Sequence, residues 1–262
     1  MKCVRADYPA DWNAANIYTL ADLHIGDAHC MQQEVERRIK EIQEDPHGLC
    51  ILNGDLMNTA LRNSVSDIYT EMLSPMQQIT EMVTMLRPIV GKIIGVTTGN
   101  HENRAYRSDG IDMTRLACRE LGIEDKYAPE GILIFLRFGT RRKHDCHNGQ
   151  TAAQWYTIYA THGSGGGRKE GAKAIRLADM ASIVDCDVFI HSHTHLPMIM
   201  KQNFFRTSPA NCSAMCIERL FVNTGAALNY GGYGQAQEFK PSSVSTPVIH
   251  LQAYKKQATA TL

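Results

Sequence analysis

The sequence has no excess of charge of either sign, since its 262 residues include 27 Lys and Arg against 27 Asp and Glu. No net field therefore draws the protein toward nucleic acid or a membrane, although a local basic patch stays possible. Apolar runs fall well short of the roughly 20 residues that a membrane span needs. The start, MKCVRADYPADWN, is too polar for a signal peptide. We expect no membrane partner.

Cysteine spacings typical of zinc ribbons or small disulfide scaffolds are also missing. The eight cysteines are irregularly spread, at positions 3, 30, 50, 118, 146, 186, 212 and 216. Reduced thiols in a cytoplasmic protein are the simplest interpretation. Internal repeats and low-complexity segments are lacking too, apart from a polar end, KKQATATL, that we expect to be flexible.

Enough apolar material is present for a substantial core. Hydrophobic residues make up 44% of the chain and charged residues 21%, which argues against wholesale disorder. The length fits one large domain better than two. We therefore predict a single domain, 1–262, whose last part, 240–262, contains a strand and a flexible tail.

The first half of the chain predicts a strand–helix–strand unit. Residues 16–22 and 48–55 are short apolar runs typical of buried strands, and 32–44 carries Val35, Ile39 and Ile42 at helical spacing. Such units build parallel, buried sheets. The sequence therefore predicts a chain of the α/β class.

Further elements continue this mixed α/β pattern. In chain order they are a largely helical stretch at 67–87 with a break at Pro75, a strand at 92–101, a helix at 113–121, strands at 131–139 and 155–163, a helix at 171–181, a strand and an extended stretch within 186–200, and strands at 219–225 and 247–254.

Several predicted strands end in side chains that can bind a metal. They are Asp22 and His24, Asp55, Asn100 with His101, His162, and His193 with His195. In α/β sheets, ligands gather beyond the carboxyl ends of the strands, so these side chains can meet at one rim. Imidazoles, carboxylates and an amide oxygen suit Mn, Fe or Zn better than Ca. Seven ligands exceed the need of one four-coordinate ion, whereas two ions sharing a carboxylate use them all.

The motifs at these strand ends occur in the order seen in calcineurin-like metallophosphoesterases. They are DLH at 22–24, GD at 54–55, GNHE at 99–102, HG at 162–163 and HTH at 193–195. The resemblance covers residues 16 to about 225. It implies an α/β fold in which two facing mixed β-sheets are flanked by helices, a four-layer α/β/β/α sandwich.

The resemblance also implies a role for each matching residue. Asp22, His24 and His195 would hold one divalent ion. The other ion would be held by Asn100, His162 and His193, with Asp55 bridging the two.

His101 would stay off the metals and serve the leaving group. Two cations lower the pKa of a water between them and neutralise the phosphoryl oxygens. A histidine of near-neutral pKa can then supply the proton that the leaving group needs. The expected activity is metal-dependent hydrolysis of phosphoesters, most simply of diesters. Mn is the first choice of metal, with Fe, Zn, Ni or Mg as alternatives.

One departure from the family pattern leaves an alternative open. The stretch is HSHTH, with Ser192 where the family usually has glycine before its final histidine pair. Strand alternation puts His191, His193 and His195 on the same side, so His191 competes for the role of ligand. We favour the last two histidines because the motif then aligns with the following Pro197.

The segment after Asp55 narrows the choice among the branches of the calcineurin-like metallophosphoesterases. Protein serine/threonine phosphatases have Asp-Arg-Gly there, and this chain has LMNTALRN. ADLHIGD and GDLMN look closer to double-strand-break-repair nucleases and small bacterial phosphodiesterases. A DNA exo- or endonuclease is therefore one alternative. A catalytically silent interaction module of the same fold is the other.

Two basic segments bear on the substrate, which we expect to be a phosphoester, with nucleic acid as an open alternative. GSGGGRK after His162 could present Arg168 and backbone N–H groups such as that of Gly165 to a phosphate. The polar loop at 140–150 could follow a nucleic-acid backbone. The alternatives without a binding role are a flexible loop for GSGGGRK and a solvated hairpin tip for 140–150. Glu102 is a candidate for orienting a neighbouring histidine. The oligomeric state stays open.

Overall fold

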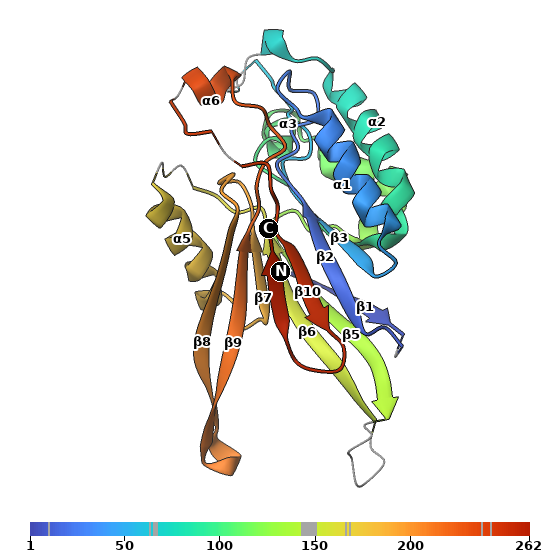
Figure 1. Cartoon of the computed structure of the whole chain (residues 1–262). Coiled ribbons are helices and arrows are strands. Elements are labelled where there is room, and N and C mark those ends of the chain that lie inside the picture. The colour runs from blue at the N-terminus through green and yellow to red at the C-terminus, as the bar shows by residue number, and fades with distance from the viewer. Residues whose placement is uncertain are drawn as a thin grey trace.

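Two mixed β-sheets face each other at the centre of the molecule, and helices flank them (Figure 1). This computed structural model describes residues 1–9, 11–62, 64, 68–142, 151–165, 167, 169–236, 238–241 and 243–262. The predicted α/β architecture of two facing mixed sheets flanked by helices is confirmed.

The larger sheet has six strands. In their order across it they are β1 (Lys2–Tyr8), β5 (Ile132–Arg142), β6 (Thr151–Thr161), β7 (Val188–His191), β9 (Ser213–Asn223) and β8 (Met198–Ser208). Strands β6, β7 and β9 run parallel, whereas β5 is antiparallel to β6 and β8 to β9. The carboxyl ends of β6 and β7 therefore lie at the same edge.

The smaller sheet has five strands. Across it they are β11 (Ala258–Thr261), β10 (Val248–Gln252), β2 (Ala14–Leu20), β3 (Gly48–Asn53) and β4 (Ile93–Thr97). Strands β2, β3 and β4 are parallel, as expected for strands joined through helices, and β10 is antiparallel to both of its neighbours.

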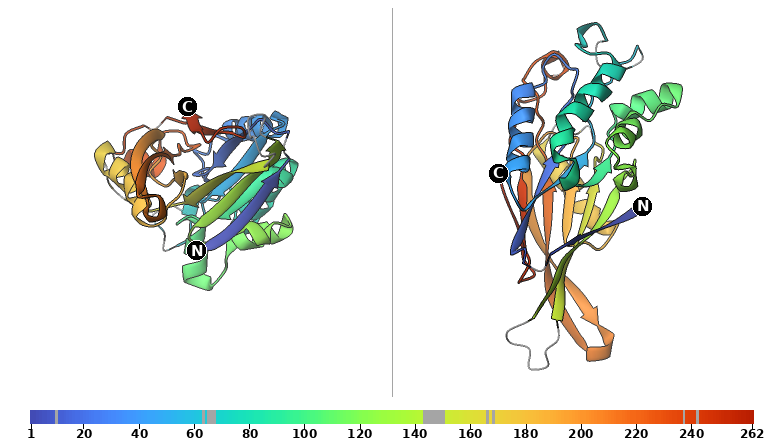
Figure 2. Two further views of the ribbon diagram at one scale, coloured as in Figure 1. Left: turned by 90° about the horizontal axis from the view of Figure 1, so that it is seen from below. Right: turned by 90° about the vertical axis from the view of Figure 1, so that its right-hand side faces the viewer.

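The helices are short to medium in length. They are α1 (Gln32–Glu44), α2 (Pro75–Leu86), α3 (Glu102–Asp109), α4 (Met113–Glu120), α5 (Glu170–Asp179) and α6 (Gly232–Ala236). Helices α1 and α2 lie side by side over the smaller sheet, as the right-hand view of Figure 2 shows. Helix α5 packs on the outer face of the larger sheet. Among the described helices, none is long and apolar enough to cross a membrane.

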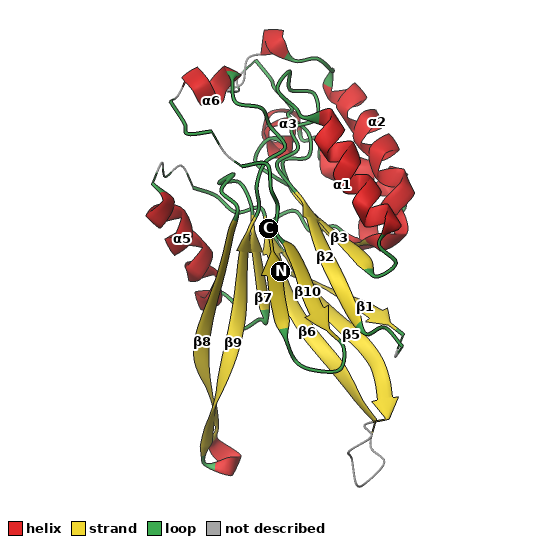
Figure 3. Cartoon of the chain, viewed as in Figure 1, coloured by secondary structure: helices red, strands yellow, loops and turns green. Residues whose placement is uncertain are grey.

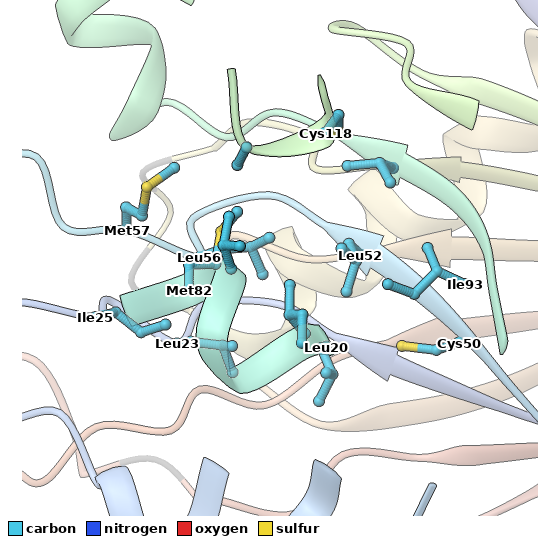
Figure 4. Close-up of a cluster of buried hydrophobic side chains, with 14 of the residues drawn as sticks. Leu20, Leu23, Ile25, Cys50, Leu52, Leu56, Met57, Met82, Ile93 and Cys118 are labelled. Carbon is cyan, nitrogen blue, oxygen red and sulfur yellow. The ribbon is translucent and has the colours of Figure 1, made fainter. Parts of the chain in front are cut away.

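Alternating side chains divide the core into layers. On β2, Ala15 and Ile17 point into the space between the sheets, whereas Leu20 packs toward the helices. Figure 4 shows the helix-side cluster, in which Leu52 of β3 and Met82 of α2 take part. A third cluster, with Leu177 and Phe189, lies between α5 and the larger sheet. Burial on both faces explains why the parallel strands are nearly all apolar.

Local signals account for the elements that the sequence predicted well. Helix α1 coincides with the predicted 32–44, because Val35, Ile39 and Ile42 form one buried stripe. The stretch 67–87 differs from the prediction, since its α-helix begins only at Pro75. Proline is favoured at the first helical position, and the Gln77 side chain accepts the Ser74 N–H at 2.9 Å.

Several elements were missed or mistaken. Strand β1 and helices α3 and α6 were not predicted, because the exposed face of β1 is polar, α3 has a weak apolar stripe and α6 has only five residues. The end KKQATATL, expected to be flexible, contains β11 instead. Its small residues pair with β10, with Ala260 opposite Ile249.

Candidate metal centre

The loops at the carboxyl ends of the parallel strands gather at one end of the two sheets (Figure 3). Asp22 and His24 follow β2, and Asp55 follows β3. The remaining predicted site residues follow the next parallel strands, Asn100 and His101 after β4, His162 after β6, and His193 and His195 after β7. The rim arrangement expected from the sequence is therefore the observed one.

Three overlapping groups of side chains are close enough to hold metal ions. Within each group the potential ligand atoms lie within 4.8 Å of one another. The groups are Asp22, His24 and His195; His24, Asp55 and His101; and Asp55, His162 and His193. His24 belongs to the first two groups and Asp55 to the last two, so these two side chains connect the three groups.

Short contacts connect the groups. His195 Nε2 lies 3.2 Å from Asp22 Oδ1, and His162 Nε2 lies 3.2 Å from Asp55 Oδ2. Asn100 Oδ1 is 3.2 Å from His162 Nε2. All seven predicted ligands thus lie in one continuous cluster, although they come from five different strand ends.

The backbone is strained at the residues of this cluster. Asp22, His24, Asp55, His193 and His195 all have positive φ, between 49° and 66°. Non-glycine residues rarely adopt this left-handed conformation, and it persists only where the surrounding structure enforces it. Such strain concentrates at functional sites, so the chain maintains this arrangement at a cost in stability.

Two motif glycines are required by close packing. A Cβ at Gly99 would lie 2.0 Å from Asp55 Oδ1, and one at Gly54 would lie 2.8 Å from the His162 ring. Gly54 also has φ +80°. Glycine at both positions therefore lets the β3 and β4 ends approach each other, which brings Asp55 beside His162.

Hydrogen bonds fix the orientation of two imidazoles. His24 Nδ1 lies 3.3 Å from Asn58 Oδ1, and His162 Nδ1 lies 2.9 Å from the carbonyl oxygen of Asn53. Because these oxygens accept, each Nδ1 carries a proton, and in the neutral ring the lone pair of Nε2 is then available to a cation. This is the neutral tautomer that binds metals through Nε2.

Buried atoms without hydrogen-bond partners test whether cations fit here. Asp22 Oδ1 and His24 Nε2 are both buried and neither has a hydrogen-bond partner among the described residues, although His195 Nε2 lies 3.2 Å from Asp22 Oδ1. The other oxygen of Asp22 accepts from His193 N at 3.1 Å and from Thr224 Oγ1 at 3.3 Å. Buried polar atoms are normally satisfied, so the two unsatisfied atoms suit a bound cation. The nitrogen and oxygen donor set fits a transition metal.

Burial and neighbouring charges set the protonation states of the metal-free site. Burial lowers the pKa of His24 to about 3 and that of His193 to about 4, so both are neutral at physiological pH. Burial opposes charge on Asp55, but His162 and His101 hold the Asp55 pKa well below its usual range. His162 shows the opposite shift, because despite its burial the Asp55 carboxylate raises its pKa to about 10. His162 is therefore charged in the metal-free site and would release its Nε2 proton when a cation binds.

His101 lies at the margin of the cluster. Its Nδ1–H donates to the carbonyl oxygen of Asn58 at 2.8 Å, and its Nε2 is 3.9 Å from Asp55 Oδ2. Arg104 Nη2 lies 3.1 Å from the same Nε2. Burial and the positive charge of Arg104 lower the pKa of His101, against the opposing effect of Asp55.

His191, the competing histidine, lies outside the three groups formed by the described residues. It is buried at the end of β7, where its Nδ1 lies 2.9 Å from Asn223 Oδ1. Its Nε2 faces Gly163, where a Cβ would come within 2.0 Å. His191 thus packs beneath the loop that follows His162.

Glu102 differs from its expected role of orienting a histidine. It is 1% exposed and accepts four backbone N–H groups. Its Oε2 accepts from Asp55 at 3.1 Å and Gly99 at 3.0 Å, and its Oε1 from Leu56 at 2.5 Å and Met57 at 2.9 Å. Glu102 therefore holds the loops after β3 and β4 together. Burial and the Asp55 charge raise its pKa to about 7.

Several supporting residues were not found by sequence reasoning. Asn58 contacts both His24 and His101, and Asn53 and Asn223 hold His162 and His191. Asn58 belongs to the GDLMN stretch, so its position after Asp55 was a usable signal. Asn53 and Asn223 carry no such signal, because each ends an ordinary apolar strand.

The proposed substrate-binding segments are only partly described. Arg168 lies outside the described residues, as do residues 143–150 of the basic loop. Gly165 lies between β6 and α5, and a Cβ there would be 3.7 Å from Arg176 Nε. Gly165 therefore lies beside α5. Its role in binding a phosphate stays a prediction.

Comparison with known proteins identifies a family. A model described as calcineurin-like phosphoesterase matches residues 23–197, a range that begins directly after Asp22 and includes the other six predicted ligands. No curated protein matches the chain.

Several solved structures are similar over most of their length. A metallophosphoesterase from Sphaerobacter thermophilus has 12% identity and a TM-score of 0.40, covering 94% of this chain and 87% of that one. Vps29 of Entamoeba histolytica complexed with zinc has 13% identity and a TM-score of 0.39, covering 94% and 89%. A predicted phosphoesterase from Streptococcus pneumoniae TIGR4 has 14% identity and a TM-score of 0.36, covering 95% and 97%.

Proposed function

The chain belongs to the calcineurin-like phosphoesterases, and from this we propose that it is a phosphodiesterase that works with two divalent metal ions. The observation that carries the proposal is the convergence of seven donor side chains from five strand ends. Two buried donor atoms there lack hydrogen-bond partners, which supports cation binding.

The donors divide into two sets around Asp55. Asp22, His24 and His195 would hold one ion, and Asn100, His162 and His193 the other, with the Asp55 carboxylate shared. The close groups Asp22, His24, His195 and Asp55, His162, His193 support this division, and a further close group joins Asp55 to His24. When bound, two such ions activate water and neutralise phosphoryl charge. The mixed nitrogen and oxygen set makes manganese our first choice.

His101 would serve the leaving group. It lies beside the cluster, and Asn58 holds its Nδ1, so that Nε2 is the atom available to a substrate. Once Nε2 has taken up a proton from water, the doubly protonated ring would donate that proton to the departing alkoxide, which is otherwise a poor leaving group. Its partial burial, with 15% of the side chain exposed, still allows contact with a bound ester.

A substrate panel tests this function. The purified protein is assayed with Mn, Ni, Zn or Mg against a chromogenic phosphate monoester, the matching diester, cyclic nucleotides, and single- and double-stranded DNA. We expect hydrolysis of the diester in Mn, and loss of that activity in D55N. The exposed Asp179 at the end of α5 offers a control, since D179N should retain activity.

The panel also separates the alternatives. Cleavage of DNA with little activity on small diesters would replace the proposal with a nuclease. Less than one equivalent of transition metal after purification, with no hydrolysis in added Mn, would favour a silent interaction module. The complete donor set argues against the latter, because degraded sites usually lack members.

A further inference from the structure

The guanidinium of Arg104 lies at the margin of the metal-ligand cluster. Arg104 is in the first turn of α3, three residues after His101 at the N-cap, so the two side chains lie on the same side of the helix. Its Nη2 lies 3.1 Å from His101 Nε2, and its Nη1 lies 3.3 Å from the carbonyl oxygen of Asn58. Because His101 Nε2 is itself 3.9 Å from Asp55 Oδ2, the guanidinium reaches within about 7 Å of that carboxylate.

The direction of the hydrogen bonds follows from the chemistry of the groups. The Asn58 carbonyl can only accept, so the proton of the neutral His101 ring is on Nδ1. A guanidinium can only donate, so Arg104 donates to the lone pair of His101 Nε2. Arg104 therefore occupies the one atom of His101 that a substrate would need.

We propose that Arg104 binds a non-bridging phosphoryl oxygen of the substrate, exchanging its contact with His101 Nε2 for that oxygen. The inference rests on the proposed phosphoesterase function and adds a substrate-binding residue to it. Arginine suits this role because its guanidinium is always charged and donates charge-assisted hydrogen bonds to phosphate oxygens.

The three residues directly after Asp55 include no positively charged side chain that could bind the phosphate. Protein serine/threonine phosphatases carry a phosphate-gripping arginine shortly after the bridging aspartate, whereas here Leu56, Met57 and Asn58 follow Asp55. Leu56 and Met57 are fully buried and offer no charge. In this chain a positive charge reaches the same region from α3 instead.

The exchange also leaves His101 accessible. The contact between Arg104 Nη1 and the Asn58 carbonyl is on the other branch of the fork, so it can persist while Nη2 turns to the phosphoryl oxygen. His101 keeps its own bond to Asn58, and its Nε2 becomes free to take up from water the proton that the leaving group needs. Substrate binding would thus break the contact between Arg104 Nη2 and His101 Nε2, which occupies both groups when no substrate is bound.

Binding of inorganic phosphate tests the inference without relying on turnover. The probe is orthophosphate, titrated calorimetrically into the Mn-loaded protein, with R104Q, R104K and R107Q compared with wild type. Arg107 is on the same helix, exposed, and of equal charge. Metal content and circular dichroism are measured for each variant.

We expect R104Q to weaken phosphate binding about 10- to 100-fold with unchanged metal content, since a charge-assisted hydrogen bond is lost. R104K should recover part of this loss, because a lysine keeps the charge but not the fork. R107Q should change binding less than about 2-fold, as expected for a screened surface charge.

Two results would overturn the inference. One is a wild-type protein, loaded with Mn, that binds no phosphate at millimolar concentration. The other is equal phosphate affinity in correctly folded R104Q or R104K and wild type. If wild type binds phosphate, R104Q weakens that binding, and no ester is hydrolysed, the proposed function fails while the Arg104 contact stands.

Discussion

Replacing Glu102 with glutamine tests how the metal-ligand loops are held together. The carboxylate accepts four backbone N–H groups, two on each oxygen, and joins the loop after β3 to the loop after β4. Glutamine has nearly the same shape but replaces one oxygen by an NH2 group. Whichever way the amide is turned, two buried N–H donors then face another donor.

The expected loss follows from those two donors. Each buried N–H left without an acceptor costs about 1–3 kcal/mol, so E102Q should lower the free energy of unfolding by about 2–6 kcal/mol. That is a large part of the roughly 5–15 kcal/mol that stabilises an ordinary domain. Metal affinity should fall as well, because the strained Asp55 backbone, with φ +49°, loses one of its anchors.

The assay is denaturant unfolding at pH 8 with a chelator present, so that metal binding does not mask the difference. E120Q is the matched control, since Glu120 is exposed on α4 and pairs with Arg87 at 3.5 Å. It should change the free energy of unfolding by less than about 1 kcal/mol. If the unfolding free energy of E102Q stayed within about 0.5 kcal/mol of the wild-type value, with an unchanged denaturant slope, Glu102 would not hold the two loops together as proposed.

Three further predictions follow from the same site. H101A should retain its metals but slow diester hydrolysis about 10²- to 10⁴-fold, most for poor leaving groups; normal rates on those substrates would exclude His101. D55N should weaken both ions together in metal titrations, and loss of one ion alone would contradict the bridging role. The metal-free protein should be most stable near pH 6.5, as denaturation across pH 5–9 would show. Below that pH the unfolded chain binds protons that folded His24 and His193, with pKa about 3 and about 4, do not bind. Above it the unfolded chain releases the proton that folded His162, with pKa about 10, still holds, so stability falls in both directions. A flat profile would contradict these shifts.

Local patterns made much of the fold predictable. The stripe of Val35, Ile39 and Ile42 specified α1, and apolar runs specified the parallel strands. Strands β1 and β11 escaped prediction because neither contains a continuous apolar run. Their extended conformation comes from pairing with β5 and β10, which are distant in the sequence.

The candidate site divides in a similar way. The ligand cluster was predictable from the order of the motifs. Each donor directly follows a strand, and the fold places the ends of these strands at one rim. The choice between His191 and its neighbours was not predictable from alternation. The chain leaves the strand at His191, and positive φ at His193 and His195 turns those two rings toward the cluster.

By itself, the sequence determined which donors are present and that they come at strand ends, since residue type and apolar periodicity are local properties. Only the tertiary structure decided what holds them. The Glu102 carboxylate, the Asn58 carbonyl and the Arg104 guanidinium acquire their roles through hydrogen bonds between segments that meet after folding. Such bonds depend on distances in space that no sequence spacing encodes.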